Sequence, residues 1–251
     1  ADAYEKGNIL RVCIQALNYV NVQKDLVTIA KKIRALCNIP ISVSCQPLTR
    51  ETTQILAKVG VNRVSIALDA VTKELFNKIK GAKSGGLYKW ENHLAALRKA
   101  VEVFGRNNVS THLIAGLGER EEDFIKLIQT CTNMGVYPAV FAFTPISGTI
   151  MEHNSPPPIN YYRKLQIAQY LIIHGLSHYE KMKFDKGYLY DFGLEKENLL
   201  KIVKTGEPFR TSGCPGCNRP YYNERPSGPI YNYPRKLKKA EVAEIEKVLC
   251  L

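Results

Sequence analysis

The sequence predicts an α/β fold built on a parallel sheet. Five short apolar runs alternate with longer stretches in which apolar residues recur at helical spacing, a pattern typical of right-handed βαβ units. The short runs are apolar enough to predict that helices cover both faces of the sheet. From Leu176 onward this periodicity gives way to sequence rich in aromatic residues, proline and glycine, which predicts an irregular C-terminal lobe.

The strands are expected where the apolar runs end at polar or turn residues. They cover Ile9–Ala16, Ile41–Cys45, Val64–Leu68, Val109–Ala115 and Ala139–Phe143. Between and after them, apolar residues three and four apart predict the helices. These span Leu26–Cys37, Thr49–Gly60, Thr72–Ile79, Leu94–Phe104, Glu121–Cys131 and Tyr161–Ile173. Pro40 ends the first helix, Thr49 caps the second and Gly60 closes it.

Composition agrees with a folded protein. The 251 residues are 45% hydrophobic and 23% charged, which gives ample core material for one large domain or two small ones and excludes a disordered chain. No apolar run approaches the roughly 20 residues of a membrane helix, so no membrane association is expected. A net charge of +12 favours an acidic partner. Seven cysteines without a secretory leader predict a cytoplasmic location and no disulfide framework.

Three strand ends carry residues suited to ligand binding, and in parallel sheets sites form at the carboxyl ends of strands. Asp69 follows the third strand, Gly116-Leu117-Gly118 the fourth, and Thr144-Pro145 the fifth. A carboxylate at position 69 can accept two hydrogen bonds from ribose hydroxyls, or it can cap the helix that begins near Thr72. The two glycines let a ligand approach the backbone, although a single GxG is a weak signal.

The sharpest local motif is Cys214-Pro-Gly-Cys217. Two thiolates at this spacing in a turn can bind one metal ion or one iron of a cluster. A zinc knuckle completed by a distant ligand is the alternative, whereas a redox dithiol pair fits the surrounding glycine, asparagine and proline less well. Cys13 or Cys45, on the first two strands, could complete the ligand set.

Four stretches resemble the radical S-adenosylmethionine enzymes, and most closely the branch that contains biotin and lipoyl synthases. They read GVNRVSIALDAVTKELFNKIKG, YKWENHLAALRKAVEVFG, VSTHLIAGLGE and FAFTPISGT. The later stretch RTSGCPGCNRPYYNERPSGPIYNYP resembles the two-component lipoyl synthases of archaea and some bacteria. The resemblance implies a partial (β/α)6 TIM-like barrel over residues 1–175, without its first strand in this chain. A cysteine-containing lobe with a terminal helix would follow over residues 176–251.

The resemblance also implies roles for individual residues. Asp69 would bind the ribose of S-adenosylmethionine, and the backbone around Gly116 and around Phe143, Thr144 and Pro145 would line its other parts. Cys214 and Cys217 would hold an auxiliary iron–sulfur cluster, with Ser212 as a further contact. The family's Cys-x3-Cys-x2-Cys triplet, which binds the [4Fe-4S] cluster that cleaves S-adenosylmethionine, does not occur in this sequence. Its ligands are therefore expected upstream of Ala1.

The function that the resemblance implies is that of a lipoyl synthase subunit, which inserts sulfur into a protein-bound octanoyl chain. Its partners would be an octanoylated lipoyl-carrier protein or domain and a second radical S-adenosylmethionine subunit. Two alternatives stay open: another sulfur-inserting enzyme similar to biotin synthase, and a zinc-stabilised basic module that binds RNA or a protein. Nucleic acid is the weaker expectation, because the sequence has no recognisable RNA-binding motif.

Overall fold

A five-stranded parallel sheet forms the centre of the computed structural model, which describes residues 1–214 and 228–250. Its strands are β1 (Val12–Gln15), β2 (Ile41–Cys45), β3 (Val61–Ile66), β4 (Val109–Ala115) and β5 (Val136–Ala142). They lie side by side in chain order. Because βαβ crossovers are right-handed and the order never reverses, the connecting helices fall on one side of the sheet. This is the winding of a barrel wall, and it confirms the predicted partial TIM-like barrel.

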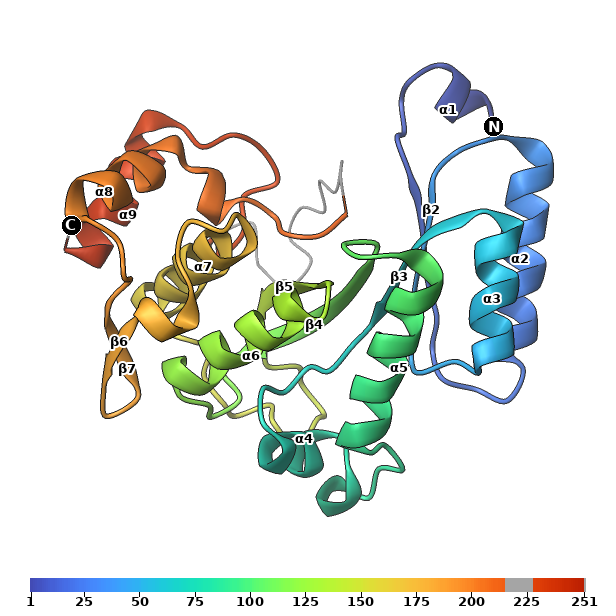
Figure 1. Cartoon of the computed structure of the whole chain (residues 1–251), viewed down its shortest axis with the longest axis horizontal. Coiled ribbons are helices and arrows are strands. Elements are labelled where there is room, and N and C mark those ends of the chain that lie inside the picture. Colours follow the sequence, from blue (N-terminus) through green and yellow to red (C-terminus); the bar gives the residue numbers. More distant parts are fainter. Residues whose placement is uncertain (215–227, 251) are drawn as a thin grey trace.

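The helices follow one another around the sheet in chain order (Figure 1). They are α2 (Val22–Leu36), α3 (Arg50–Val59), α4 (Lys73–Ile79), α5 (Trp90–Phe104), α6 (Glu121–Asn133) and α7 (Ile159–Ile173), with short α1 (Asp2–Glu5) ahead of β1 and a 3-10 turn at Ala82–Ser84. The predicted caps of α3 are confirmed, since the Thr49 hydroxyl accepts the Thr52 amide at 3.2 Å and Gly60 closes the helix at φ 95°. None of the helices in the described ranges is long and apolar enough to cross a bilayer.

The expectation that both faces of the sheet are apolar is wrong. In β2, Val43 belongs to the core under the helices, whereas Ser42 and Ser44 line a cavity on the other face. The register carries this polar face across the sheet, because Ser42 lies beside Arg63 and Ser44 beside Ser65. Alternate residues of a strand point to opposite faces, so β2, β3 and β4 present an apolar side to the helices and a polar side to the cavity, whereas β5 lines the cavity with Ala139, Val140 and Phe141.

Three strands also differ in their boundaries from the prediction, and the first of them, β1, covers Val12–Gln15 rather than Ile9–Ala16. β3 begins at Val61 rather than Val64 and ends at Ile66, because a charged residue, Arg63, belongs to the strand and faces the cavity. β5 begins at Val136 rather than Ala139, and Pro138 lies inside it. β5 is an edge strand of the sheet that the described residues form, and an edge tolerates a residue without an amide hydrogen.

The C-terminal lobe is more regular than predicted. It holds the antiparallel hairpin of β6 (Lys183–Asp185) and β7 (Tyr188–Asp191), then α8 (Lys196–Thr205), two 3-10 turns (Tyr179–Lys181 and Glu207–Phe209) and the expected terminal helix α9 (Lys239–Leu249). Val203 and Phe209 of this lobe are buried in the same hydrophobic cluster as Val140 of the sheet. The lobe is therefore packed on α7 and β5, and it positions the chain that enters the cavity.

Hydrogen bonds from α7 hold that returning chain. The guanidinium of Arg163 donates to the carbonyl of Ile230 at 2.6 Å, and the Gln166 amide donates to that of Tyr231 at 2.9 Å. Arg210 and Tyr233 form a parallel bridge beside them. These contacts fix residues 210–214 next to the sheet.

Candidate functional site

The structure brings the three predicted strand-end positions to one edge. Asp69 follows β3, Gly116 follows β4 and Phe143 follows β5, and these strands are neighbours that run in the same direction. The Phe143 amide donates to the carbonyl of Ala115 at 2.8 Å, which extends the ladder one residue beyond β5. Thr144 is exposed and Pro145 is half-buried at the same edge. The fold therefore brings these residues together at one edge of the sheet, as predicted.

Asp69 has a strained but well-supported backbone. Its φ of 66° is unusual for a residue with a side chain, and two hydrogen bonds to β4 hold it. The Asp69 amide donates to the carbonyl of His112 at 2.8 Å, and the Ile114 amide donates to that of Asp69 at 2.7 Å. Asp69 does not cap α4, because Thr72 is the N-cap and its hydroxyl accepts the Leu75 amide. The carboxylate is thereby available for another role.

The partner of that carboxylate is Lys80, whose Nζ lies 2.7 Å from Oδ2 of Asp69 and also donates to the carbonyl of Ala67 at 2.9 Å. The side chains of Lys80 and Asp69 are 11% and 24% exposed, so water screens this ion pair only partly. The Tyr88 ring centroid lies 5.3 Å from the same ammonium. The lysine therefore orients Asp69 and engages one of its two oxygens.

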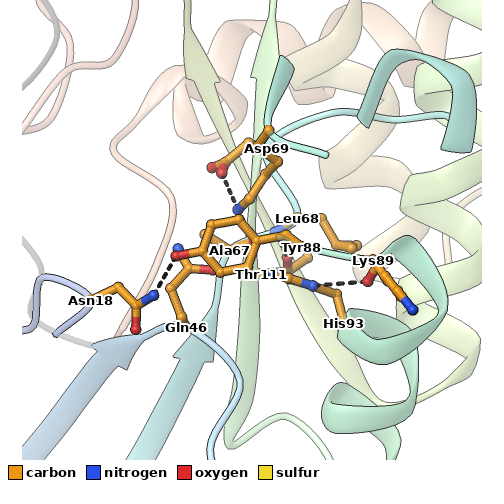
Figure 2. A network of polar contacts seen from close by, with 10 residues as sticks. Asn18, Gln46, Ala67, Leu68, Asp69, Tyr88, Lys89, His93 and Thr111 are labelled. Carbon is orange, nitrogen blue, oxygen red and sulfur yellow. Dashed lines mark hydrogen bonds and ion pairs between the residues drawn. The ribbon is translucent and has the colours of Figure 1, made fainter. Parts of the chain in front are cut away.

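A second group of contacts supports this edge from below (Figure 2). His93 is 1% exposed, its Nδ1 donates to the Lys89 carbonyl at 3.1 Å, and its Nε2 lies 3.1 Å from the side-chain amide of Gln46. Burial, and next the charge of Lys80, lower the pKa of His93 to about 4. The ring is therefore neutral at pH 7 and acts as a hydrogen-bonding support.

The turn after β4 is held by Glu119. One carboxylate oxygen accepts the Gly116 amide at 2.7 Å, the other accepts the Leu117 amide at 2.8 Å, and the Tyr161 hydroxyl donates to the first. Burial and the neighbouring Glu119 raise the pKa of Tyr161, so its phenol stays protonated. Two backbone amides that could have faced a ligand are thus already engaged by this chain's own glutamate.

Gly116 and Gly118 have different reasons to be glycine. A Cβ at Gly116 would lie 3.0 Å from Cδ of Pro157 and 3.3 Å from Cβ of Phe143. A Cβ at Gly118 would meet nothing within 4 Å, although both residues have a φ near 100°. A side chain at Gly116 would therefore need Pro157 or Phe143 to shift slightly, whereas Gly118 has open space beside it.

Below this edge the polar face of the sheet lines a cavity of about 470 Å³, a volume suited to a small-molecule ligand. Its wall combines apolar surface with many polar side chains among the described residues. They include Arg11, Gln15, Ser42, Ser44, Arg63, Ser65, Ser110, His112, Thr211, Ser212, Cys214 and Asn232. The cavity lies along the middle of the strands, from Cys13 and Gln15 of β1 to Ala139 and Phe141 of β5.

Cys214 and Ser212 lie on the wall of this cavity rather than at the strand ends. The Cys214 sulfur is 3.3 Å from Oγ of Ser42, and the Ser212 hydroxyl accepts the Val140 amide at 3.2 Å. Cys217 lies outside the described residues. No cluster of three or more His, Cys, Asp or Glu side chains suited to a metal occurs within residues 1–214 and 228–250.

The two cysteines offered as extra ligands lie on opposite faces of the sheet. Cys13 lines the cavity with Cys214. Cys45 is 5% exposed in the core, where burial raises the pKa of its thiol to about 12. Of these two cysteines, only Cys13 is placed to join Cys214, so the proposal that Cys45 completes the site is wrong.

The sequence-based assignments missed Lys80, His93, Glu119 and Arg63. Glu119 had a signal, because it ends the stretch VSTHLIAGLGE three residues after Gly116. Arg63 also had one, since polar and apolar residues alternate in RVSI, the last four residues of β3. Lys80 and His93 had none, because they reach the edge only after the loop that follows α4 folds back on β3.

Comparison with known proteins gives a family. Residues 1–131, just over half of the chain, match the family model described as the radical SAM superfamily. An uncharacterised protein of Methanocaldococcus jannaschii is 28% identical over 159 residues, which cover 61% of this chain and 40% of that protein. A probable GTP 3′,8-cyclase of Saccharolobus solfataricus is 25% identical over 205 residues, 79% of this chain and 59% of that enzyme. The chain spans about half the length of these curated relatives.

A solved structure agrees on the fold. The crystal structure of HydG, a maturase of the [FeFe]-hydrogenase, superposes with a TM-score of 0.55 at 15% identity, over 68% of this chain and 41% of that one. At this identity the likeness concerns the fold alone. None of these three proteins is named a lipoyl or biotin synthase, so the comparisons support the superfamily and leave its branch open.

Proposed function

The chain belongs to the radical SAM superfamily, and on that premise we propose that its strand-end residues bind S-adenosylmethionine and that its polar cavity holds the substrate. The superfamily uses a [4Fe-4S] cluster and S-adenosylmethionine, which together supply hydrogen abstraction from carbon. This chain's own contribution is to bind, to orient and to exclude water.

The strand-end residues fit S-adenosylmethionine. Oδ1 of Asp69 makes no hydrogen bond with any residue that the structure describes, while Lys80 holds Oδ2. A carboxylate has several lone-pair sites, so a ribose hydroxyl can still donate to Asp69. Phe143 and Pro145 offer partly exposed apolar surface beside it for an adenine ring. Glu119 keeps the β4 turn in the shape that this arrangement needs.

The cysteines of this chain do not fit the cluster that cleaves S-adenosylmethionine. The sequence has no Cys-x3-Cys-x2-Cys triplet, and the residues described contain no group of three candidate ligands. We therefore derive no step through that cluster. The expectation that its ligands come from outside this chain stays a prediction.

The reaction we propose is sulfur insertion into an unactivated carbon, in the first instance of a protein-bound octanoyl chain. The observation that supports it is the position of Cys214 on the cavity wall, with Cys13 on the same wall. A sulfur-bearing group held there would face a substrate that fills the cavity. The assignment of Cys214 and Cys217 to an auxiliary cluster, with Ser212 nearby, is part of this proposal.

The partners are proposals too. An octanoylated lipoyl-carrier domain would suit the +12 net charge if its surface is acidic, and a second radical S-adenosylmethionine subunit would complete the enzyme. A cytoplasmic location likewise stays a prediction.

The experiment that tests the cysteine site is metal analysis of the anaerobically purified chain. Iron with acid-labile sulfide, lost in Cys214→Ala and kept in Cys250→Ala, is the expected result. Zinc without sulfide would contradict the cluster and would make the motif a structural knuckle. Cys250 is exposed at the end of α9, which makes it a matched control for the loss of one thiol.

The experiment that tests the reaction is mass spectrometry of products. The complete enzyme, with its partner subunit and reductant, is given an octanoyl-lysine carrier peptide or dethiobiotin. Thiolated octanoyl peptide is expected, and thiolation of dethiobiotin alone would favour a biotin synthase-like enzyme. In parallel, Asp69→Asn should weaken S-adenosylmethionine binding about tenfold, while exposed Asp185→Asn should not.

A second candidate is favoured by the polarity of the cavity. Two arginines line it, which suits a small anionic substrate better than a neutral acyl amide. Dethiobiotin carries a carboxylate, and the name of the Saccharolobus relative indicates a nucleoside triphosphate. We therefore keep a radical S-adenosylmethionine reaction on a small anion as the alternative.

A further inference from the structure

We propose that the cavity contains a binding site for an oxyanion, a carboxylate or phosphate group, centred on the guanidinium of Arg63. The proposal rests on the proposed function only in taking the cavity as the substrate site. It names the chemical class of one end of the substrate, the end held between the strands. It does not depend on which reaction follows.

The first observation is a group of polar atoms without partners. Four buried side-chain atoms on the cavity wall make no hydrogen bond with any residue that the structure describes: Nε of Arg11 and of Arg63, Oγ of Ser65 and Oγ1 of Thr211. Buried polar atoms in folded proteins nearly always have partners, and exceptions gather where a ligand supplies the bond. The strand-end residues described above contribute no atom to this group.

The second observation is the burial of the charge. Arg63 is 9% exposed, and it forms no ion pair or hydrogen bond within the described part of the chain. A guanidinium cannot lose its proton, so it stays charged and needs an anion or water beside it. Its planar fork of donors matches a carboxylate or a phosphate.

The composition of the wall agrees with this assignment. The described lining residues include Arg11 and Arg63 and no aspartate or glutamate. Arg11 already donates a hydrogen bond to Oγ of Ser42 at 3.0 Å. Arg11 therefore adds positive charge to the cavity, while the guanidinium donors of Arg63 remain available for a ligand. Ser65 on the same strand and Ser44 beside it are placed to donate further hydrogen bonds to the same group.

The position of Arg63 says which end of a substrate it would hold. Asp69 lies beyond the end of β3 and pairs with Leu113 of β4, whereas Val64 pairs with Val109, so Arg63 and Asp69 are separated by about five residues of strand, roughly 17 Å at the usual rise. An anion at Arg63 is therefore far from the proposed ribose site. A substrate anchored there would have to be elongated, with its reacting carbon above the charged group.

The test is calorimetric titration of the purified full chain with three probes: octanoate, its neutral amide octanamide, and inorganic phosphate. Octanoate should bind roughly 10- to 100-fold more tightly than octanamide, because only the acid forms charge-assisted hydrogen bonds. Phosphate that binds or competes more strongly than octanoate would identify a phosphorylated substrate instead. Equal affinities for octanoate and octanamide, together with no phosphate binding, would overturn the proposal.

Two variants that each replace an arginine by glutamine make the test specific to Arg63. Arg63→Gln should abolish the preference for the acid over the amide, whereas Arg98→Gln, on the exposed side of α5, should keep it. Retention of the preference in Arg63→Gln would overturn the proposal. The comparison of the two probes on the unaltered chain stands even if Arg63→Gln fails to fold.

The outcomes also separate this inference from the proposed reaction, because the titrations contain neither S-adenosylmethionine nor reductant. Arg63-dependent anion binding without thiolated product in the enzyme assay would refute sulfur insertion and leave the anion site in place. Thiolated product from an enzyme whose cavity shows no Arg63-dependent preference would refute the anion site alone.

Discussion

The carboxyl edge of the parallel sheet and the cavity beside the middle of its strands differ in how their buried polar groups are satisfied. At the carboxyl end, Asp69 is paired with Lys80, and Glu119 accepts two backbone amides. In the cavity beside the middle of the strands, Arg63 and Ser65 have buried atoms that make no hydrogen bond with a described residue. The difference indicates that the carboxyl end is a preorganised frame, whereas the cavity is completed by what it binds.

The contrast has an energetic meaning that substitutions can test. Removal of a side chain that hydrogen-bonds to other buried groups should lower the free energy of unfolding, because it leaves those groups without a hydrogen bond. Removal of a side chain whose own polar atom has no hydrogen-bond partner should change the free energy of unfolding little, or should raise it.

The largest effect is expected at Glu119. Glu119→Ala should lower the free energy of unfolding by about 4 kcal/mol, since it leaves two backbone amides and the Tyr161 hydroxyl without their hydrogen-bond acceptor. Urea denaturation measures it, and Glu91→Ala at the exposed N-terminal turn of α5 is the control, with no measurable change expected. If the two variants lose the same stability, the carboxyl end is not the rigid frame that we describe.

The second effect is a pH dependence from His93. Its folded pKa of about 4 lies below the usual 6.5, so the unfolded chain binds more protons between those values. The contribution of His93 to the free energy of unfolding is therefore fully present above pH 6.5, and it is lost, by about 3 kcal/mol, as the pH falls toward 4. The measurement is the free energy of unfolding at pH 7 and pH 4 in the unaltered chain and in His93→Gln, which should lack this component. An identical slope in both would contradict it.

The third prediction compares two threonines directly. Thr111 is fully buried and its hydroxyl accepts the Leu68 amide at 3.0 Å, so Thr111→Val should cost about 1.5 kcal/mol. Thr211 on the cavity wall has a buried hydroxyl without a described partner, so Thr211→Val should be neutral or should stabilise the chain by up to about 1 kcal/mol. Thermal and urea denaturation of the matched pair should show a loss of stability in Thr111→Val only, and equal losses in both variants would remove the distinction between satisfied and unsatisfied hydroxyls.

The smallest effect separates backbone strain from packing at the β4 turn. Gly116→Ala and Gly118→Ala both introduce a side chain at a positive φ, but only the first places Cβ against Pro157. Gly116→Ala should therefore cost about 1 kcal/mol more than Gly118→Ala. Unfolding curves of the two variants measure the difference, and its absence would mean that the Pro157 segment moves aside.

Much of the fold could be predicted from the sequence because local patterns determine it. The periodicity of apolar residues placed each strand and helix of the sheet, and a glycine or proline marked several of their ends. The polar face was not predicted, although the serines in ISVSC alternate strictly with Ile41, Val43 and Cys45. The helix α8 was missed although Leu199 and Val203 are four residues apart, since aromatic residues and glycine flank it.

The candidate site divides in the same way. Asp69, Gly116 and Phe143 could be predicted to converge, because strand direction and order place them at one edge. The Lys80 ion pair and the support from His93 depend on how one loop folds back, and no local spacing encodes that. The cavity depends on tertiary structure throughout, since its wall combines β1 to β5 with residues 211–214 from the other end of the chain.

The alternation of faces along each strand has a consequence for engineering this fold. Ser42, Ser44, Ser65 and Ser110 line the cavity, while their sequence neighbours Val43, Val64 and Val109 fill the core. Because one set of positions faces the ligand and the other faces the helices, ligand preference and folding can be altered separately. Larger, apolar or acidic residues at the serine positions would reshape the chamber or reverse its charge, and the helix packing would not need to be redesigned.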